Sequence, residues 1–359
     1  MQWEWLQWRR QWLNWVVLAA MLVFLTFSYG NLQQTNAASI EKELTLLADE
    51  KLQLQQLEDE IAQQRAKNRD QQLKAVQDQR RRLQQYAIAL EQREKGLARV
   101  RLAYFQGIKT GTSPLSERKK DTVDEAIARD TYLIKHRLVA EETLEQPTPA
   151  GFLITIQNRN VFTGLLVILV LQIAGVFSSD WEKRRYRLLY TLPHPRWQLL
   201  VRKLAFAGTV AMADLVVTMG AAYFGAAVNA NNFGGWTYPL VTVNHQIVPL
   251  RVIFELNCLS MIQLILISLV LITCTGLLLR DHFGTILVLG IGCVAAGLMA
   301  KVKVGWLPQE LNPVRWIGLT DYWRVMAPEH WFGGSCMTTV VIILLMGITC
   351  LLCFKSHTR

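Results

Sequence analysis

Long apolar runs recur along the chain and are separated by polar segments. A run of about eighteen apolar residues is long enough to cross the hydrocarbon of a bilayer as a helix. Six such runs predict an all-α polytopic membrane protein with six transmembrane helices, whose two ends lie on the same side of the membrane. The runs are Leu13–Tyr29, Val161–Ser178, Leu204–Val228, Ile253–Leu279, Phe283–Ala300 and Thr338–Phe354.

The only large polar region lies between the first two runs, at residues 31–160, and its pattern is helical. It contains no glycine or proline between Ile40 and Lys95. Apolar residues recur every seven positions in two sets that differ in phase, and this spacing is typical of a coiled coil. The sets are Ile40, Leu47, Leu54 and Ile61, and Val76, Leu83, Leu90 and Leu97, with the sequence RAKNRDQQ at the break between them.

The change of phase leaves two alternatives for residues 40–105, a single long helix or a hairpin. One rod would rise about 100 Å, and the chain would then have to descend that distance through a further predicted helix at Asp121–Leu144. The first arm is acidic and the second is basic, so antiparallel arms would attract each other. We therefore favour a helical hairpin that folds back near Lys67–Asp70.

Five tryptophans lie within the first fifteen residues. In a helix, four of them fall on one face at spacings of three, four and three, with polar side chains such as Arg9 and Arg10 on the other. Indole side chains concentrate where hydrocarbon meets water, so the stripe predicts an amphipathic helix anchored in membrane lipid before the first span. The four anchors are Trp5, Trp8, Trp12 and Trp15.

The distribution of lysine and arginine predicts the orientation of the spans. Short loops rich in these residues stay in the cytoplasm. The segment between spans two and three is strongly basic, whereas residues 229–249 contain no lysine or arginine. Both termini are therefore predicted to be cytoplasmic and residues 31–160 extracytoplasmic, because long translocated segments escape the charge rule. The net charge of +10 is spread over the coil and the cytoplasmic loop, a pattern that does not indicate a nucleic-acid interface.

The sequence offers no catalytic or metal-binding constellation. All six cysteines lie in or beside apolar runs, and the pair Cys350 and Cys353 has no second pair or histidine ligand near it. The segment GIKTGTSPLS at residues 107–116 lacks the Gly-Lys-Ser/Thr ending of a phosphate-binding loop. We therefore expect a chain that is not an enzyme and holds no cofactor of its own.

The cytoplasmic stretch at residues 179–203 combines basic and apolar side chains with two prolines. Pro193 and Pro195 prevent one continuous helix, so we expect two short helices that meet at a turn. Here the sequence resembles the type-2 family of ABC transporter permeases, in which an acidic residue is followed by a pattern like E…LL…P…R…LL…K. The matching residues are Glu182, Leu188, Leu189, Pro193, Arg196, Leu199, Leu200 and Lys203, while Arg184 or Arg185 stands where many members have glycine.

The resemblance implies a six-span subunit with an elbow helix before span one, which the tryptophan stripe would form. It also implies that this stretch is a coupling helix that docks on a separate ATPase. The expected partners are an ABC ATPase dimer that binds ATP and magnesium, a second permease subunit, and an envelope partner reached through the coiled coil. The predicted coupling residues are Glu182, Arg184, Arg185, Leu188, Leu189, Leu192, Pro193, Pro195, Arg196 and Lys203.

One ionisable residue, Asp214, lies near the middle of the third apolar run. A carboxylate inside a bilayer is costly unless it is paired or hydrated, so it marks a candidate functional position. Gln172 in span two and Gln263 in span four are the predicted hydrogen-bonding partners. The sequence leaves two roles open for Asp214, part of a substrate path or a polar packing contact.

These predictions divide the chain into five parts. They are 1–30 with the elbow and first span, 31–160 with the extracytoplasmic helical domain, 161–178 with span two, 179–203 with the coupling region, and 204–359 with spans three to six. The expected function is export across the bacterial inner membrane. Two alternatives remain, a mechanotransmission subunit that works on envelope partners, and a membrane-anchored coiled-coil scaffold that transports nothing.

Overall fold

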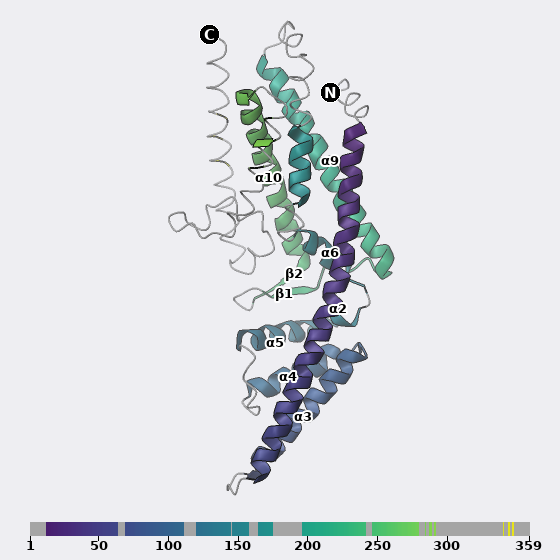
Figure 1. The fold of residues 1–359 in the computed structure, drawn as a ribbon, viewed down its shortest axis with the longest axis vertical. Coiled ribbons are helices and arrows are strands. Elements are labelled where there is room, and N and C mark those ends of the chain that lie inside the picture. The colour runs from purple at the N-terminus through teal and green to yellow at the C-terminus, as the bar shows by residue number, and fades with distance from the viewer. Residues whose placement is uncertain are drawn as a thin grey trace. The chain divides into compact units, whose positions relative to one another are not determined.

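The computed structural model describes residues 12–63, 69–110, 120–144, 146–157, 164–174, 196–241 and 246–279, with a few single helical positions beyond residue 280. The described chain is mostly helical (Figure 1). It divides into two compact units, each of which is described by itself. The span unit comprises the described residues of Met1–Ser28, Leu153–Phe224 and Ile253–Arg359, and the hairpin unit comprises those of Tyr29–Phe152 and Gly225–Val252.

Three described helices are long and apolar enough to cross a membrane, α2 (Trp12–Gln63), α9 (Arg196–Ala230) and α10 (Leu250–Leu279). They contain the predicted spans one, three and four. A shorter apolar helix at Gly164–Ala174 falls within the predicted second span. Of predicted spans five and six, only single helical positions lie within the described part.

Close contacts join the helices within the span unit. A Cβ added at Gly164 would lie 3.0 Å from a ring carbon of Phe24, and one added at Gly208 would lie 3.1 Å from a methyl group of Leu269. Glycine at these two positions therefore allows the backbones to approach, as is typical of membrane helices. Other apolar side chains remain exposed, among them Val23 and Val216, as expected of surfaces that face lipid.

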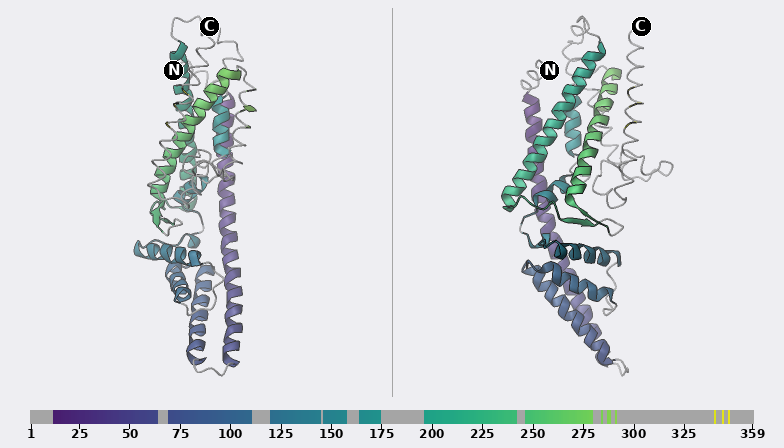
Figure 2. Two further views of the ribbon diagram at one scale, coloured as in Figure 1. Left: turned by 90° about the vertical axis from the view of Figure 1, so that its left-hand side faces the viewer. Right: turned by 180° about the vertical axis from the view of Figure 1, so that it is seen from behind.

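The hairpin unit is built on two antiparallel helices, the second half of α2 and α3 (Arg69–Glu91), which run side by side in both views of Figure 2. Glu58 on α2 accepts hydrogen bonds from Gln77 and Arg80 on α3, and Glu43 accepts one from Tyr86. The partners move forward along α3, from Arg80 to Tyr86, as the contacts move back along α2 from Glu58 to Glu43, so the two helices are antiparallel. Seven of the eight predicted heptad residues are buried, six of them on α2 and α3 (Leu47, Leu54, Ile61, Val76, Leu83 and Leu90), and the seventh, Leu97, at the start of the next helix.

Six short elements complete the described part of the hairpin unit. Helix α4 (Leu97–Lys109) packs against α3 and against α5 (Lys120–Lys135). A 3₁₀ turn, η1 (Glu141–Thr143), and helix α6 (Pro149–Ile156) follow. Strands β1 (Pro239–Val241) and β2 (Ile247–Pro249) form an antiparallel pair with Leu240 opposite Val248, and α5 packs on β1.

Two helices of this unit end at an arginine in the left-handed conformation. At the end of α3, Arg93 has φ 50°, and the amides of Arg93 and Glu94 bond to the carbonyls of Leu90 and Ala89. This is a Schellman cap, whose left-handed position is usually glycine. Arg137 ends α5 in the same way with φ 55°. The predicted helix Asp121–Leu144 is therefore too long. Its early end was not predicted, because the left-handed position of this cap is an arginine and not the usual glycine.

Candidate functional site

Asp214 and Gln172 lie together in the span unit. Asp214 is on α9 and 5% exposed, and Gln172 is on the helix Gly164–Ala174 and 6% exposed. The side-chain amide of Gln172 donates a hydrogen bond of 2.7 Å to Asp214 Oδ2. Two of the three polar residues that the sequence placed inside the membrane are thus in direct contact.

A second contact extends this site to α2. Thr218, one turn along α9, donates a hydrogen bond of 2.6 Å from its hydroxyl to the backbone carbonyl of Asp214. The same hydroxyl lies 3.7 Å from the sulfur of Met21 on α2. Three segments of the span unit therefore meet around the carboxylate.

Other buried polar side chains lie on α10. Gln263 is buried there, and its contact with Asp214 stays a prediction. Asn257, which sequence reasoning did not single out, donates a hydrogen bond of 2.8 Å to Gln157, and both side chains are fully buried. Amide pairs of this kind hold membrane helices together, and this one was not predicted because Gln157 lies before the predicted second span, outside the apolar runs.

The arrangement around Asp214 has defined chemical capacities. A carboxylate in apolar surroundings must be protonated, hydrogen-bonded or paired with a cation. Gln172 supplies one donor, and its own carbonyl oxygen has no hydrogen-bond partner within the described part of the chain. The pair therefore has capacity for a proton, a water molecule or a donor group of a ligand.

Most predicted coupling residues, Glu182 to Pro195, lie outside the described residues. Arg196 is the first residue of α9, and Lys203 lies two turns further along the same helix. The stretch from Arg196 to Lys203 is therefore continuous with span three rather than a separate short helix. The reason is local, since no glycine or proline stands between Pro195 and the apolar run.

The tryptophan stripe is divided in a similar way. Trp5 and Trp8 lie outside the described residues, whereas Trp12 begins α2 and Trp15 follows within its first turn, half-exposed. Trp12 and Trp15 thus belong to the same helix as the first span. Their interfacial role stays a prediction.

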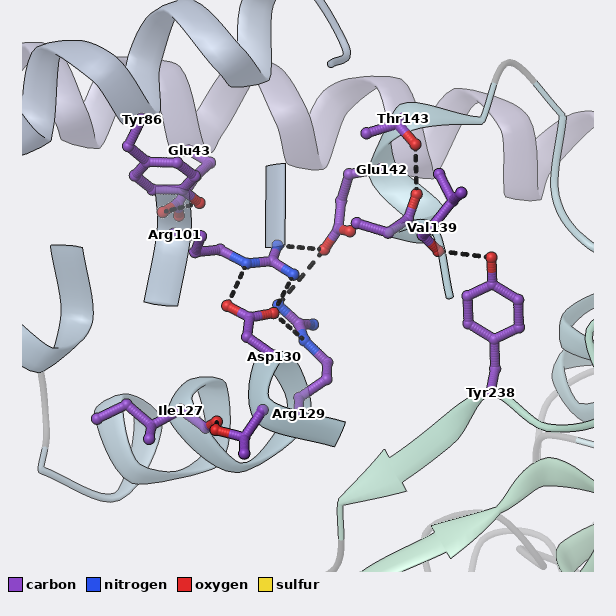
Figure 3. Close-up of polar contacts among 12 residues, drawn as sticks. Glu43, Tyr86, Arg101, Ile127, Arg129, Asp130, Val139, Glu142, Thr143 and Tyr238 are labelled. Atoms are coloured by element: carbon purple, nitrogen blue, oxygen red, sulfur yellow. Dashed lines mark hydrogen bonds and ion pairs between the residues drawn. The ribbon is translucent and has the colours of Figure 1, made fainter. Parts of the chain in front are cut away.

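A buried ion cluster in the hairpin unit was not predicted from the sequence (Figure 3). Arg101 on α4 forms two hydrogen bonds of 2.8 and 2.7 Å with the carboxylate of Asp130 on α5, and one of 2.8 Å with Glu142 in η1. Arg129 lies 3.4 Å from the same oxygen of Glu142. One guanidinium therefore joins three consecutive elements of this unit.

The cluster shifts the acidity of its members. Burial alone would raise the pKa of Glu142, but the charges of Arg101 and Arg129 and the hydrogen bond from Arg101 lower that pKa to about 2. Burial alone would also lower the pKa of Arg101, and the charge of Glu142, together with Asp130, raises it instead. Nearby, burial and the charges of Glu141 and Glu142 raise the pKa of Tyr238 to about 12, and its hydroxyl donates to the carbonyl of Val139.

Comparison with models of known protein families assigns the chain to one family. The family described as ABC-2 family transporter protein matches residues 1–332. The chain belongs to this family. No curated protein and no solved structure matches it.

Membership in the ABC-2 family has direct consequences. The chain is a membrane-embedded permease subunit of an ABC transporter and has an ABC ATPase subunit as its partner. The matched range includes α2, α9 and α10, the residues of the hairpin unit, and the stretch from Glu182 to Lys203. Within the described residues, no group of three or more His, Cys, Asp or Glu side chains is placed to hold a metal ion.

Proposed function

We propose that the chain is the permease subunit of an ATP-driven exporter in the bacterial cytoplasmic membrane. It works with a second permease subunit and two ATPase copies, and both of its termini face the cytoplasm. The observation that carries this proposal is the ABC-2 family match over residues 1–332. ATP and magnesium bind to the partner ATPase, because the chain carries no phosphate-loop motif.

The geometry of α9 supports a mechanical route from the ATPase to the membrane interior. Arg196, at the end of the predicted coupling region, and Asp214 lie on one unbroken helix. Eighteen residues separate them, which corresponds to a rise of about 27 Å. Movement of the coupling region when the ATPase closes on ATP would therefore reach Asp214 directly. It would also strain the hydrogen bond from Gln172, which comes from a different helix.

The test combines Arg196→Glu with Leu192→Ala in the full chain, expressed with the ATPase of its own transporter. We expect loss of copurification and of permease-stimulated ATP hydrolysis by at least about tenfold, because both a positive charge and an apolar contact leave the docking surface. Glutamate at the first residue of α9 suits the helix dipole, so the helix itself is retained.

Arg99→Glu is the matched control, because it reverses an exposed arginine on α4 of the hairpin unit. It should leave association and hydrolysis unchanged. Unchanged ATPase association in the double variant would reject the coupling assignment. Failure of the wild-type chain to copurify with any ATPase would reject transport and favour a scaffold.

A second function, mechanotransmission to an envelope partner, is favoured by the continuity of α2. This helix runs without a break from the first span into the hairpin unit over 52 residues, a rise of about 78 Å. In this proposal α2 carries motion of the first span into the hairpin. In this mode the ATPase cycle works on the hairpin and no substrate crosses the membrane.

An experiment that introduces a flexible joint into α2 distinguishes the two functions. Replacement of the exposed residues Gln34 and Thr35 by glycine weakens the helix there, and replacement by alanine is the control. For mechanotransmission, hydrogen exchange in α3 should respond to ATP in the wild type and the alanine variant but not in the glycine variant. An α3 that is insensitive to ATP in all three proteins contradicts this mode.

A further inference from the structure

A pocket of about 210 Å³ lies in the hairpin unit. One wall is a single face of α2, formed by residues that include Gln33, Asn36 and Ile40. The rest of the lining comes from η1 and the segment after it, with Glu141 and Glu142, and from Arg93 in the turn after α3. Three segments of the chain, α2, the turn after α3 and η1, thus contribute polar side chains to one small volume.

Along α2, the residues that line the pocket follow directly after the predicted membrane-crossing stretch. About twenty helical residues cross the hydrocarbon, and a count of twenty from Leu13 ends at Leu32. Gln33 and Asn36 therefore lie within roughly 6 Å of the hydrocarbon boundary. This is the depth of the lipid headgroups, which add about 5 to 8 Å on each side of the bilayer.

Arg93 is held at the pocket at a cost in free energy. Its backbone is left-handed, with φ 50°, a conformation that glycine adopts more readily than any other residue. Arginine is not required by this cap, since glycine would fill the same backbone position with less strain. The exposed guanidinium of Arg93 forms no ion pair with another described residue, so it remains available to an anion.

The part of the lining that comes from η1 is acidic, and contacts within the hairpin unit hold both of its carboxylates. Glu142 is fixed by Arg101 and Arg129. Glu141 accepts a hydrogen bond of 3.0 Å from Thr148, whose hydroxyl also caps the amide of Gly151 at the start of α6. Arg93 and Glu141 line the same pocket without forming an ion pair, so the space between them suits a group that carries both charges.

We propose that this pocket binds the headgroup of a zwitterionic phospholipid, with its phosphate at Arg93 and its ammonium group at Glu141. Guanidinium groups bind phosphate through charge-assisted hydrogen bonds, and carboxylates accept hydrogen bonds from ammonium. The amides of Gln33 and Asn36 supply further hydrogen bonds at the same depth. The proposal depends on α2 crossing the bilayer and is independent of ATP-driven transport.

The test is binding of short-chain phosphatidylethanolamine to the purified full chain in detergent, measured by native mass spectrometry. Phosphatidylglycerol with the same acyl chains and free phosphoethanolamine are the comparison ligands. We expect the wild-type chain to bind phosphatidylethanolamine most tightly. Arg93→Gly should weaken this binding by about tenfold without lowering the thermal unfolding midpoint, because glycine suits the left-handed position.

Two further variants make the test specific. Glu141→Gln should remove the preference for phosphatidylethanolamine over phosphatidylglycerol, because only the ammonium contact is lost. Lys95→Gly removes an exposed charge from the same turn outside the pocket, and it should bind as the wild type does.

Several outcomes would overturn the proposal. Wild-type binding by Arg93→Gly would exclude Arg93 as the phosphate contact. An equal loss of lipid binding in Lys95→Gly would show that binding depends only on the overall charge of the turn. A lower thermal unfolding midpoint in Arg93→Gly would show that Arg93 has a structural role. Competition by free phosphoethanolamine as effective as that of the lipid would assign the pocket to a soluble zwitterion instead.

Discussion

At the scale of single residues, Asp214 and Arg101 are two buried ionisable side chains that differ in their hydrogen-bonding partners. Asp214 has one neutral donor, Gln172, whereas Arg101 has two carboxylates around it. Asp214 could be predicted from the sequence because it is an ionisable residue near the middle of an apolar run. Gln172 could be predicted because it is a polar residue in a neighbouring apolar run. The cluster around Arg101 had no such signal, because its partners lie 29 and 41 residues away in ordinary polar stretches.

The shifted acidity of Glu142 predicts a loss of stability in acid. Its pKa is about 2 in the folded chain against 4.5 as a reference, so its contribution is complete above pH 4.5 and disappears as the pH falls towards 2. Glu142→Gln should therefore be less stable than the wild type at pH 7 by up to about 3 kcal/mol. The difference should shrink between pH 4.5 and 2. Thermal unfolding of the full chain by circular dichroism measures it.

An exposed carboxylate of the same unit provides the comparison for this experiment. Glu94→Gln, in the turn after α3, is the matched control, because it replaces an exposed carboxylate outside the ion cluster. A constant difference between Glu142→Gln and the wild type from pH 7 to pH 2 would show that the ion cluster contributes nothing to acid sensitivity.

Asp214 gives a second prediction at this scale. Asp214→Asn keeps the size of the side chain and an acceptor for Gln172, so the unfolding free energy should stay within about 1 kcal/mol of the wild type. If the carboxylate lies on a substrate path, permease-stimulated ATP hydrolysis should fall severalfold. Stimulation equal to that of the wild type would leave Asp214 as a packing contact.

At the scale of elements, periodicity was a good guide to helix faces and a poor guide to helix ends. The change of heptad phase correctly indicated separate helices, since α2 ends at Gln63 and α3 begins at Arg69. The early end of α5 and the early start of α9 were not predicted. Helix α5 ends early because Arg137 adopts a left-handed conformation. Helix α9 starts early because no glycine or proline after Pro195 interrupts the polar residues that precede the apolar run.

The seam of the hairpin predicts unequal effects for two nearby leucines of α2. Leu54 is 0% exposed and Leu52 is 59% exposed. Leu54→Ala should lower the unfolding free energy by about 3 kcal/mol or more, because it leaves a cavity in the seam. Leu52→Ala should change it by no more than about 0.5 kcal/mol. Thermal unfolding of both variants measures the contrast, and equal losses would contradict the packing of α2 on α3.

At the scale of the whole molecule, apolar length identified a membrane protein and the family confirms it. Three predicted spans correspond to described helices. Which end of each span faces the cytoplasm depends on charges outside the hydrocarbon, and the fold alone does not encode it. The assignment of orientation therefore stays a prediction from the positive-inside rule.

Orientation is tested by labelling of single cysteines in a cysteine-free background. A cysteine at Gln92, exposed after α3, should react with a membrane-impermeant maleimide in intact cells whose outer membrane has been made permeable. A cysteine at Arg202, exposed near the start of α9, should react only after lysis. Labelling of both sites in lysed cells is the control, and the reverse pattern would invert the topology.

The unbroken course of α2 limits how its length can change during evolution. Each inserted residue would turn everything beyond it by about 100° around the helix axis, so one extra residue near position 35 would rotate the seam leucines away from their present direction. Seven extra residues would restore that direction to within about 20°. Homologues that keep this helix intact should therefore differ in length here by about seven or eleven residues rather than by one or two.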